Sequence, residues 1–254
     1  MTWWDAAFLA AAGIVGGLTG SIAGLASVAT YPALLLVGLP PVTAKVTNTV
    51  ALVFNGIGSV WGSRPELKGQ EAWIKRIVPA AALGGATGAA LLLSTPAEGF
   101  ERVVPILLGV ASLAIVLPRR ANRYAKVASH QRHTATAYFE VAAIFLISIY
   151  GGYFGAAAGV LLLALLLGAG QDTLAHANAG KNVLLGVANG VAALAFVFLA
   201  PVQWLAVIPL GAGCLIGSRL GPMVVRHAPA GPLRLMIGVS GLALAVKLGV
   251  DTYG

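Results

Sequence analysis

Residues 16–24 read Gly-Gly-Leu-Thr-Gly-Ser-Ile-Ala-Gly, and residues 151–159 read Gly-Gly-Tyr-Phe-Gly-Ala-Ala-Ala-Gly. Each stretch lies within apolar sequence and is followed by a short apolar run that ends at a glycine, Gly38 or Gly168. Short, glycine-interrupted segments at matching places in two halves of an apolar chain are typical of membrane proteins built from two related repeats. This pair of stretches therefore predicts both the class of fold and its division into halves.

The composition of the chain indicates an integral membrane protein. Of its 254 residues, 58% are hydrophobic and 9% are charged, whereas an average soluble domain has about 25% charged residues. So few charges could not cover the surface of a soluble domain, and we predict an all-α integral membrane protein. The single cysteine, Cys214, excludes an intrachain disulfide. Because Met1–Asp5 contains no Lys or Arg, we expect the first apolar run to be a retained span.

The apolar runs predict about ten transmembrane segments. A spanning helix needs about 20 apolar residues to cross a hydrocarbon core of about 30 Å. Eight runs are predicted as long spans: Ala6–Ala26, Val46–Gly62, Trp73–Leu93, Val103–Leu117, Tyr138–Ala158, Val183–Leu199, Trp204–Ser218 and Leu233–Leu248. Two short runs, Val28–Leu39 and Val160–Gly170, correspond to only about 15–20 Å of helix. We expect these two to be short helices flanked by breaks, and whether they cross or re-enter stays open.

The basic residues predict the orientation. Most Lys and Arg residues gather in three connections, Arg64–Arg76, Arg119–Arg132 and Arg219–Arg234. The positive-inside rule places these connections in the cytoplasm, and ten crossings then put both termini outside. The net charge of +8 is accordingly interpreted as solvated cytoplasmic loops, and nucleic-acid binding is not expected.

The two halves correspond beyond their glycine stretches. Thr47-Asn48 aligns with Lys181-Asn182, and Asn55-Gly56 aligns with Asn189-Gly190. Five segments per half is an odd number, so the second half would enter the membrane in the opposite sense, as in an inverted-topology repeat. The predicted domains are a first transmembrane repeat at 1–118, a cytoplasmic basic linker at 119–137 and a second repeat at 138–254. Glycine pairs four residues apart, at 84/88 and 213/217, predict close helix packing.

The chain resembles the sulfite exporter TauE/SafE family, also called the toluene sulfonate uptake permease family. The resemblance rests on Gly16–Gly24 and the Tyr31–Pro41 region in the first half, and on Gly151–Gly159 and Ala177–Asn182 in the second. It spans nearly the whole chain and keeps the order of the two halves. The resemblance implies a transporter of sulfite, sulfonates or related sulfur oxyanions in the bacterial cytoplasmic membrane.

Lys45 and Lys181 are predicted to supply the positive charge of the substrate site. They follow the two short apolar runs and do not lie in the three basic connections. Ionisable groups at membrane depth are costly, and an ammonium beside amide and hydroxyl donors suits an oxyanion. The predicted substrate-binding residues are Lys45, Thr47, Asn48, Asn55, Asn178, Lys181, Asn182 and Asn189. We expect the two polar stretches to converge on one site. Lysines that snorkel to the interface, and asparagines that only bond neighbouring helices, remain alternatives.

Four glycines and one histidine complete the candidate site. Gly20, Gly24, Gly155 and Gly159 are predicted to be backbone breaks that line it, with close helix packing as the alternative. His176 is a candidate proton carrier, since histidine generally titrates near neutral pH, and a loop histidine without a role is the alternative.

These observations together predict a secondary transporter. The sequence has no catalytic constellation, no metal-ligand spacing and no Walker-type loop, so we expect no enzyme activity, no cofactor and no drive by ATP. The predicted substrate is a small sulfur oxyanion such as sulfite, sulfoacetate or thiosulfate, moved by alternating access, and a passive anion channel is the alternative. The expected partners are the anionic substrate, a coupling ion (sodium or proton) and the lipid bilayer, with a homo-oligomer left open.

Overall fold

The computed structural model is helical and contains no strand in the part of the chain that it describes, namely residues 1–96, 98–100, 134–169 and 173–227 with 102, 106, 109, 239, 242, 243, 246, 249 and 250. Its helices are α1 (Trp3–Ala23), α2 (Ala26–Leu36), α3 (Pro41–Gly62), α4 (Arg64–Leu67), α5 (Glu71–Ser94), α7 (Thr134–Tyr153), α8 (Ala158–Gly168), α9 (Leu174–Leu199) and α10 (Trp204–His227). Within these residues, α1, α5, α9 and most of α10 are long and apolar enough to cross a membrane. The predicted helical class is therefore confirmed for the described residues.

Six of the eight predicted long spans coincide with helices, namely α1, α3, α5, α7, α9 and α10. The other two, Val103–Leu117 and Leu233–Leu248, lie outside the described residues except at single positions, as does the basic linker up to residue 133. Their predicted helical state accordingly stays a prediction.

Two helices begin earlier than the sequence pattern predicts. α3 begins at Pro41 instead of Val46, and α9 begins at Leu174 instead of Val183. Proline suits a first helical turn, because its fixed φ fits the helix and its missing N–H would have no partner there. Thr173 caps α9 by accepting a hydrogen bond from a backbone N–H of the first turn. Most of each polar stretch therefore forms the opening turns of a long helix instead of a connection.

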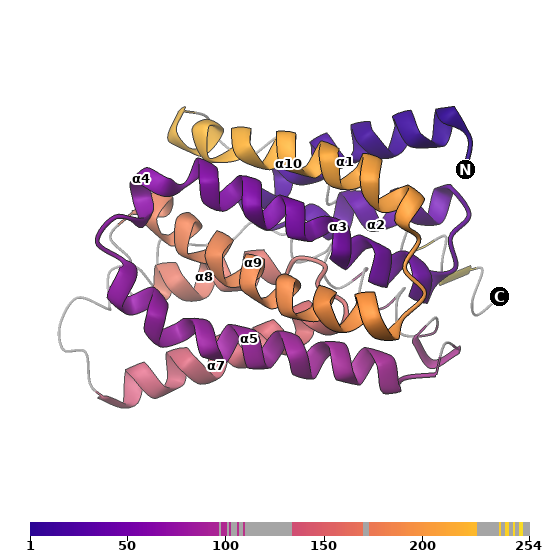
Figure 1. Ribbon diagram of the computed structural model, residues 1–254. Coiled ribbons are helices and arrows are strands. Elements are labelled where there is room, and N and C mark those ends of the chain that lie inside the picture. The colour runs from indigo at the N-terminus through magenta and orange to yellow at the C-terminus, as the bar shows by residue number, and fades with distance from the viewer. Residues whose placement is uncertain are drawn as a thin grey trace.

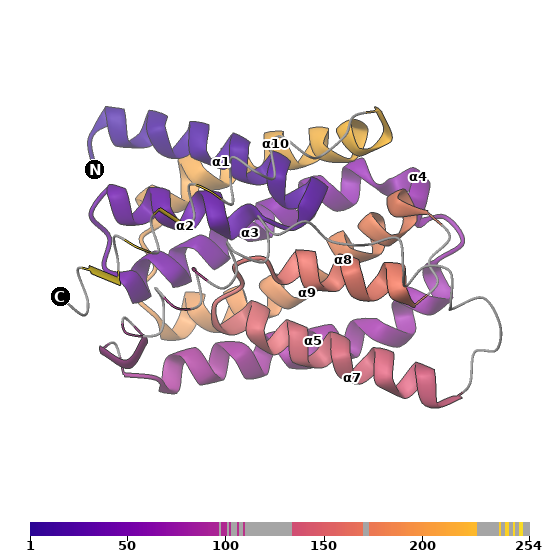
Figure 2. The same cartoon turned by 180° about the vertical axis from the view of Figure 1, so that it is seen from behind.

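The helices form two layers. α10, α3, α9 and α5 follow one another in the layer that faces the viewer in Figure 1, and α1, α2, α8 and α7 form the layer seen in Figure 2. Successive neighbours in the first layer pack against each other, and the layers are joined where α1 packs on α10 and α7 packs on α5. In these two joints a Cβ at Gly213 or Gly217 would overlap backbone of α1, and one at Gly84 or Gly88 would overlap backbone of α7. The prediction of close packing at both glycine pairs is confirmed.

The two short helices are confirmed. α2 and α8 have 11 residues each, which corresponds to about 16 Å, or roughly half of the hydrocarbon core. Each follows a break in the left-handed region, at Gly24 (φ 75°) before α2 and at Gly155 (φ 81°) and Ala157 (φ 61°) before α8. A Cβ at Gly24 would overlap the backbone of Gly159, so the two breaks adjoin. From there α2 and α8 run toward opposite ends of the bundle (Figure 2).

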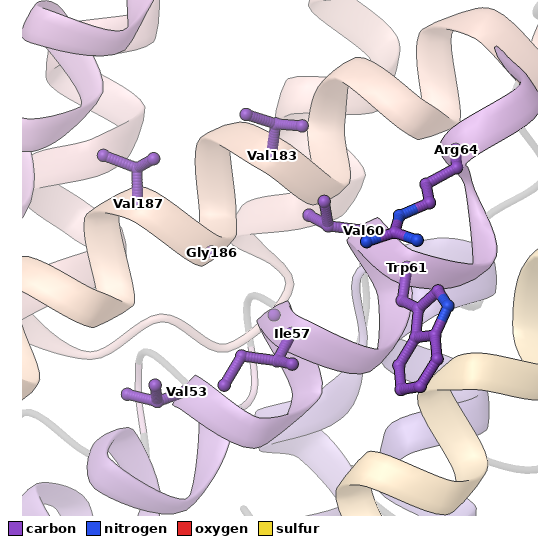
Figure 3. A pocket seen from close by; sticks show the side chains of 9 residues that line it. Val53, Ile57, Val60, Trp61, Arg64, Val183, Gly186 and Val187 are labelled. Atoms are coloured by element: carbon purple, nitrogen blue, oxygen red, sulfur yellow. The ribbon is translucent and has the colours of Figure 1, made fainter. Parts of the chain in front are cut away.

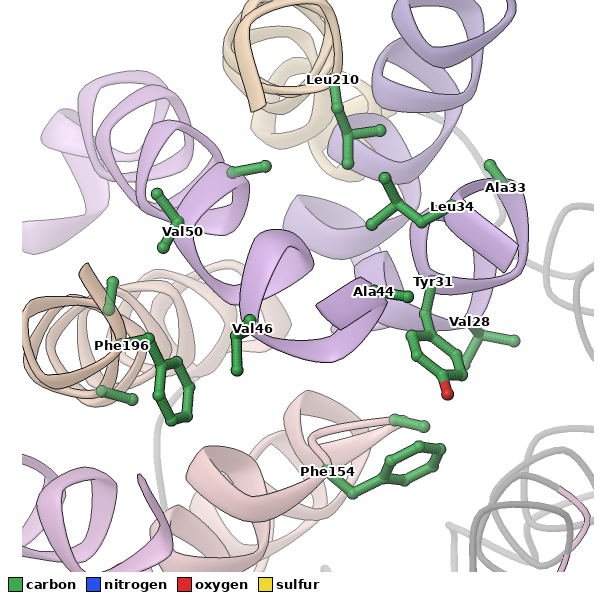
Figure 4. Close-up of a cluster of buried hydrophobic side chains, with 14 of the residues drawn as sticks. Val28, Tyr31, Ala33, Leu34, Ala44, Val46, Val50, Phe154, Phe196 and Leu210 are labelled. Carbon is green, nitrogen blue, oxygen red and sulfur yellow. The ribbon is translucent and has the colours of Figure 1, made fainter. Parts of the chain in front are cut away.

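An apolar cluster holds the breaks in place (Figure 4). Tyr31 of α2 packs edge-on against Phe154, directly after α7, with ring centroids 5.7 Å apart and planes at 80°. Val46 and Val50 of α3 and Phe196 of α9 belong to the same buried cluster. The cluster thus packs the short helices against α3 and α9, which are neighbours at the centre of the layer formed by α10, α3, α9 and α5.

The positive-inside orientation can be tested by labelling. Residues 64–70 and Glu98 flank opposite ends of α5, which has 24 residues and a length of about 36 Å. In a variant with Cys214→Ala, we expect Arg123→Cys and Arg226→Cys to react only with reagent applied to the cytoplasmic side, and Glu98→Cys only with reagent applied outside. Labelling of Arg123→Cys from outside would reverse the orientation and remove the basis for outside termini.

Candidate functional site

The two helix breaks enclose a small cavity. Its wall combines backbone and side chains from both halves of the chain: Gly20, Gly24, Ala26, Ser27, Leu52, Asn55, Gly151, Gly155, Ala158, Leu185 and Asn189. The cavity volume is about 20 Å³, which is room for about one water molecule. Irregular backbone in a membrane protein is tolerated where it lines such a space, and Gly24 and Gly155 both contribute to the cavity wall.

Two helix N-termini open onto this cavity. Ala26 and Ser27 belong to the first turn of α2, and Ala158 begins α8. Neither helix has a side-chain cap at its N-terminus. The first backbone N–H groups of a helix have no partner within it, and they carry the positive end of the helix dipole. Two uncapped N-termini at one place form a setting that favours an anion.

Asn55 of α3 and Asn189 of α9 contribute the amide side chains of the cavity wall. Asn55 is buried, with 7% of its surface exposed, and its Oδ1 has no hydrogen-bond partner among the described residues. A Cβ placed on Gly20 would lie 3.1 Å from this oxygen, so Asn55 lies against the end of α1. Rotating the amide by 180° would exchange oxygen for the donor Nδ2, so Asn55 can present either an acceptor or a donor to the cavity.

Lys181 and Asn178 hold the end of α1, whose Gly20 lines the cavity. The Lys181 Nζ donates to the carbonyl oxygens of Gly20 at 3.0 Å and Ser21 at 3.1 Å, and Asn178 Nδ2 donates to the Ser21 oxygen at 2.9 Å. Carbonyls at a helix C-terminus lack intrahelical partners and attract positive charge. Lys181 is fully buried, so the alternative that it snorkels to the interface is wrong.

Lys45 lies in different surroundings. It is also buried, at 1% exposed, which rules out snorkelling, and its Nζ donates to Thr49 Oγ1 at 2.6 Å. Thr47 Oγ1 accepts from the backbone N–H of Gln203, which directly precedes α10. Asn48 bridges to α2, because its Nδ2 donates to Ser27 Oγ at 3.2 Å and its Oδ1 accepts from Thr30 Oγ1 at 2.6 Å.

The predicted convergence of the two lysines needs correction. Asn182 Nδ2 donates to Ser63 Oγ at 3.1 Å, which places the Lys181-Asn182 pair at the C-terminal end of α3. Lys45 lies near the start of the same helix, and the 18 residues from Lys45 to Ser63 correspond to about 27 Å. The structure therefore brings Asn55 and Asn189 together at the cavity and separates the lysines.

The predicted glycines divide into two kinds. Gly24 and Gly155 adopt positive φ and are true breaks, whereas Gly20 and Gly159 lie inside α1 and α8 and are not breaks. Gly20 still lines the cavity, and Gly159 packs against Gly24. The break at Ala157, at φ 61°, was missed because alanine carries no sequence signal for that conformation.

His176 lies away from the cavity, in the first turn of α9. Its backbone N–H and its Nδ1 both approach Thr173 Oγ1, at 3.1 Å and 2.7 Å, and its carbonyl accepts from Gln70 Nε2 at 3.4 Å. Thr173 is the N-cap of α9. The half-buried Glu140 of α7 was overlooked in the sequence, and it accepts from Trp73 Nε1 at 3.1 Å.

Known proteins similar to this chain are membrane transporters by name. A family model described as sulfite exporter TauE/SafE matches residues 9–248. The probable membrane transporter protein ORF9 of a Sinorhizobium species is 29% identical, over 96% of this chain and 92% of that protein. The probable membrane transporter protein YfcA of Escherichia coli K12 is 25% identical over 95% and 88%, and one from Haemophilus influenzae is 24% identical over 96% and 94%. No solved structure matches the chain.

Proposed function

The chain belongs to the sulfite exporter TauE/SafE family and is a membrane transporter, and from this premise we propose that it moves a small sulfur oxyanion across the bacterial cytoplasmic membrane. Sulfite, thiosulfate and a sulfonate such as sulfoacetate are the proposed substrates. The observation that carries the proposal is the cavity on which the uncapped N-termini of α2 and α8 converge beside the amide of Asn55, whose Nδ2 can donate to an anion. Such a cavity combines positive helix ends with amide groups, as a small anion requires.

An inverted repeat is supported by the way the helices pair. α1, α2, α3 and α5 would correspond to α7, α8, α9 and α10. The contact of α1 with α10 then corresponds to that of α7 with α5, and the contact of α3 with α10 to that of α9 with α5. The aligned residues Gly24 and Gly159 touch each other, as expected for positions on the axis that relates two repeats.

The size of the cavity supports alternating access. A sulfur oxyanion is larger than about 20 Å³, so its binding requires the walls from the two halves to separate. Rocking of one repeat against the other around a fixed site would open the cavity to each side in turn. A passive channel would need a continuous polar path, whereas Leu52 and Leu185 contribute apolar wall to the same cavity as the asparagines. We also propose that transport is coupled to an ion, either sodium or a proton. Both termini of the chain are proposed to lie outside the cytoplasm.

The substrate proposal is tested with purified protein in proteoliposomes. Uptake of radiolabelled sulfite, thiosulfate, sulfoacetate and sulfate is compared with that of acetate, with and without sodium and proton gradients. We expect uptake of at least one sulfur oxyanion to saturate and to depend on a gradient, with acetate transported poorly. Uptake that stays linear with concentration would identify a channel, and equal uptake of acetate would remove the sulfur oxyanion from the proposal.

Replacing Asn55 with alanine should weaken substrate binding about fivefold. The amide contributes a neutral hydrogen bond to the anion, and such a bond contributes about 1 kcal/mol. Thr87→Ala is the matched control, because Thr87 is exposed on the outer face of α5 and bonds only its own helix, to Leu83 O. Isothermal titration calorimetry of both variants measures the difference. Equal affinities would mean that Asn55 does not contact the substrate.

A further inference from the structure

A second, larger hollow lies between α3 and α9. It is a groove of about 490 Å³ lined from Val53 to Arg64 on one side and from Val183 to Val187 on the other (Figure 3). Val53, Ile57 and Val60 follow the spacing of one face of α3, and Asn55, which reaches the cavity, points to another. The groove is therefore separate from the candidate substrate site, although the same two helices form both.

Basic side chains surround one end of this groove. A neighbouring hollow of about 360 Å³ shares Arg64 and Val183 with the groove, so the two adjoin. Lys68 and Lys75 also line the hollow, and Glu71 is its single carboxylate, which leaves it with a net positive charge. The Arg64 guanidinium stands 5.8 Å from the ring centre of Trp61, which lines the groove.

The length of the groove matches one leaflet of a bilayer. The nine residues from Val53 to Gly62, where α3 ends, correspond to about 14 Å, and Arg64 begins α4 just beyond this point. Half of a hydrocarbon core is about 15 Å thick. The apolar part of the groove thus extends from the middle of the membrane to its surface, and the positive charges begin where lipid headgroups begin.

We propose that this groove is a binding site for an anionic phospholipid of the leaflet at the Arg64 end. One acyl chain lies between α3 and α9 along Val60, Val183 and Val187, and the phosphate lies among Arg64, Lys68 and Lys75. Basic pockets between transmembrane helices at the cytoplasmic side bind anionic headgroups in this way. A zwitterionic lipid would bring its own positive group against the same side chains.

Charge also argues against a second copy of the chain as the occupant. Two copies related by a twofold axis at this groove would bring the same basic residues of both copies close together. Like charges placed together at an interface oppose association. The chain carries 16 Lys and Arg residues against 8 Asp and Glu residues, so it offers few carboxylates to compensate.

The test compares two lipids with identical acyl chains by native mass spectrometry of the delipidated protein. We expect phosphatidylglycerol to remain bound at about tenfold lower concentration than phosphatidylcholine. The triple variant Arg64→Gln, Lys68→Gln, Lys75→Gln should bind both lipids equally. Arg76→Gln is the matched control, because Arg76 is exposed beside Lys75 on α5 and does not line the hollow. This control should keep the preference for phosphatidylglycerol.

A variant that fills the groove tests the acyl chain separately from the charges. Val183→Phe should lower retention of phosphatidylglycerol several-fold without any change of charge. The proposal is overturned if the two lipids bind alike, or if the triple variant keeps its preference. It is also overturned if inorganic phosphate alone displaces the lipid, since the site would then bind a free anion, or if delipidated protein dimerises through this face. None of these outcomes depends on which substrate is transported.

Discussion

Gly24→Ala is expected to lower the free energy of unfolding by about 3 kcal/mol or more, or to prevent folding altogether. Gly24 has a φ of 75°, and this left-handed conformation costs a residue with a Cβ roughly 1–2 kcal/mol. The new Cβ would in addition overlap the backbone of Gly159, and overpacking costs typically about 1–3 kcal/mol. Backbone cannot rotate away as a side chain can, so the two breaks would be forced apart.

Two other glycines separate these contributions. Gly38 has a φ of 88° but no atom within 4 Å of a built Cβ, so Gly38→Ala should cost only the conformational strain of about 1–2 kcal/mol. Gly190 lies within α9 with open space around it, so Gly190→Ala should be neutral or stabilise by up to about 1 kcal/mol. Thermal unfolding in detergent, followed by intrinsic fluorescence, ranks the three variants by stability. If Gly24→Ala and Gly38→Ala lower the stability by the same amount, the contact between Gly24 and Gly159 contributes nothing to the stability of the fold.

The sequence predicted the breaks because glycine marks them directly. Gly24 is the last glycine of the first stretch and Gly155 is the third glycine of the second, and each precedes an apolar run too short to span a membrane. Both properties follow from backbone geometry, which local sequence reflects. The cavity that they enclose was predicted for the same reason, since irregular backbone in lipid must face an enclosed space.

The positions of the lysines were not predicted correctly, although the predicted topology contained the reason. In the inverted repeat that we propose, the corresponding helices α3 and α9 would begin at opposite faces of the membrane. Residues in their opening turns, such as Lys45 and Lys181, therefore lie toward opposite faces. Residues about two to three turns further on approach the middle from both sides, and for this reason Asn55 and Asn189 meet at the cavity. The starts of both helices were placed too late, which hid this difference in depth.

The other features that were not predicted from the sequence depend on tertiary contacts, which no local sequence pattern encodes. Asn178 and Lys181 donate hydrogen bonds to the end of α1 across a sequence separation of more than 150 residues, and no local sequence pattern predicts such a contact. The left-handed Ala157 and the bond of Glu140 to Trp73 are of the same kind. Each depends on how the helices pack, so each becomes visible only in three dimensions.

Lys181→Met is expected to weaken substrate binding about tenfold or more. The ammonium of Lys181 bonds the carbonyl of Gly20, a cavity residue, so its positive charge lies directly behind the cavity wall. A charge-assisted interaction contributes roughly 1.5–3 kcal/mol, and 1.4 kcal/mol corresponds to about tenfold in affinity. Asn182→Ala should weaken binding less, because Asn182 is neutral and bonds Ser63 instead of a cavity residue. Calorimetric titration of variants with equal elution profiles measures these affinities.

Lys45→Met is the matched control for the charge, because Lys45 is equally buried but its amine bonds Thr49, outside the cavity wall. We expect Lys45→Met to change the affinity by less than Lys181→Met does. A purely structural role for Lys181 would weaken all anions alike, whereas a direct electrostatic role scales with the charge of the ligand. Thiosulfate, a dianion, should therefore lose more affinity than methanesulfonate, a monoanion. If Lys181→Met weakens both anions by the same factor, the lysine only caps α1, and the helix N-termini and asparagines alone hold the substrate.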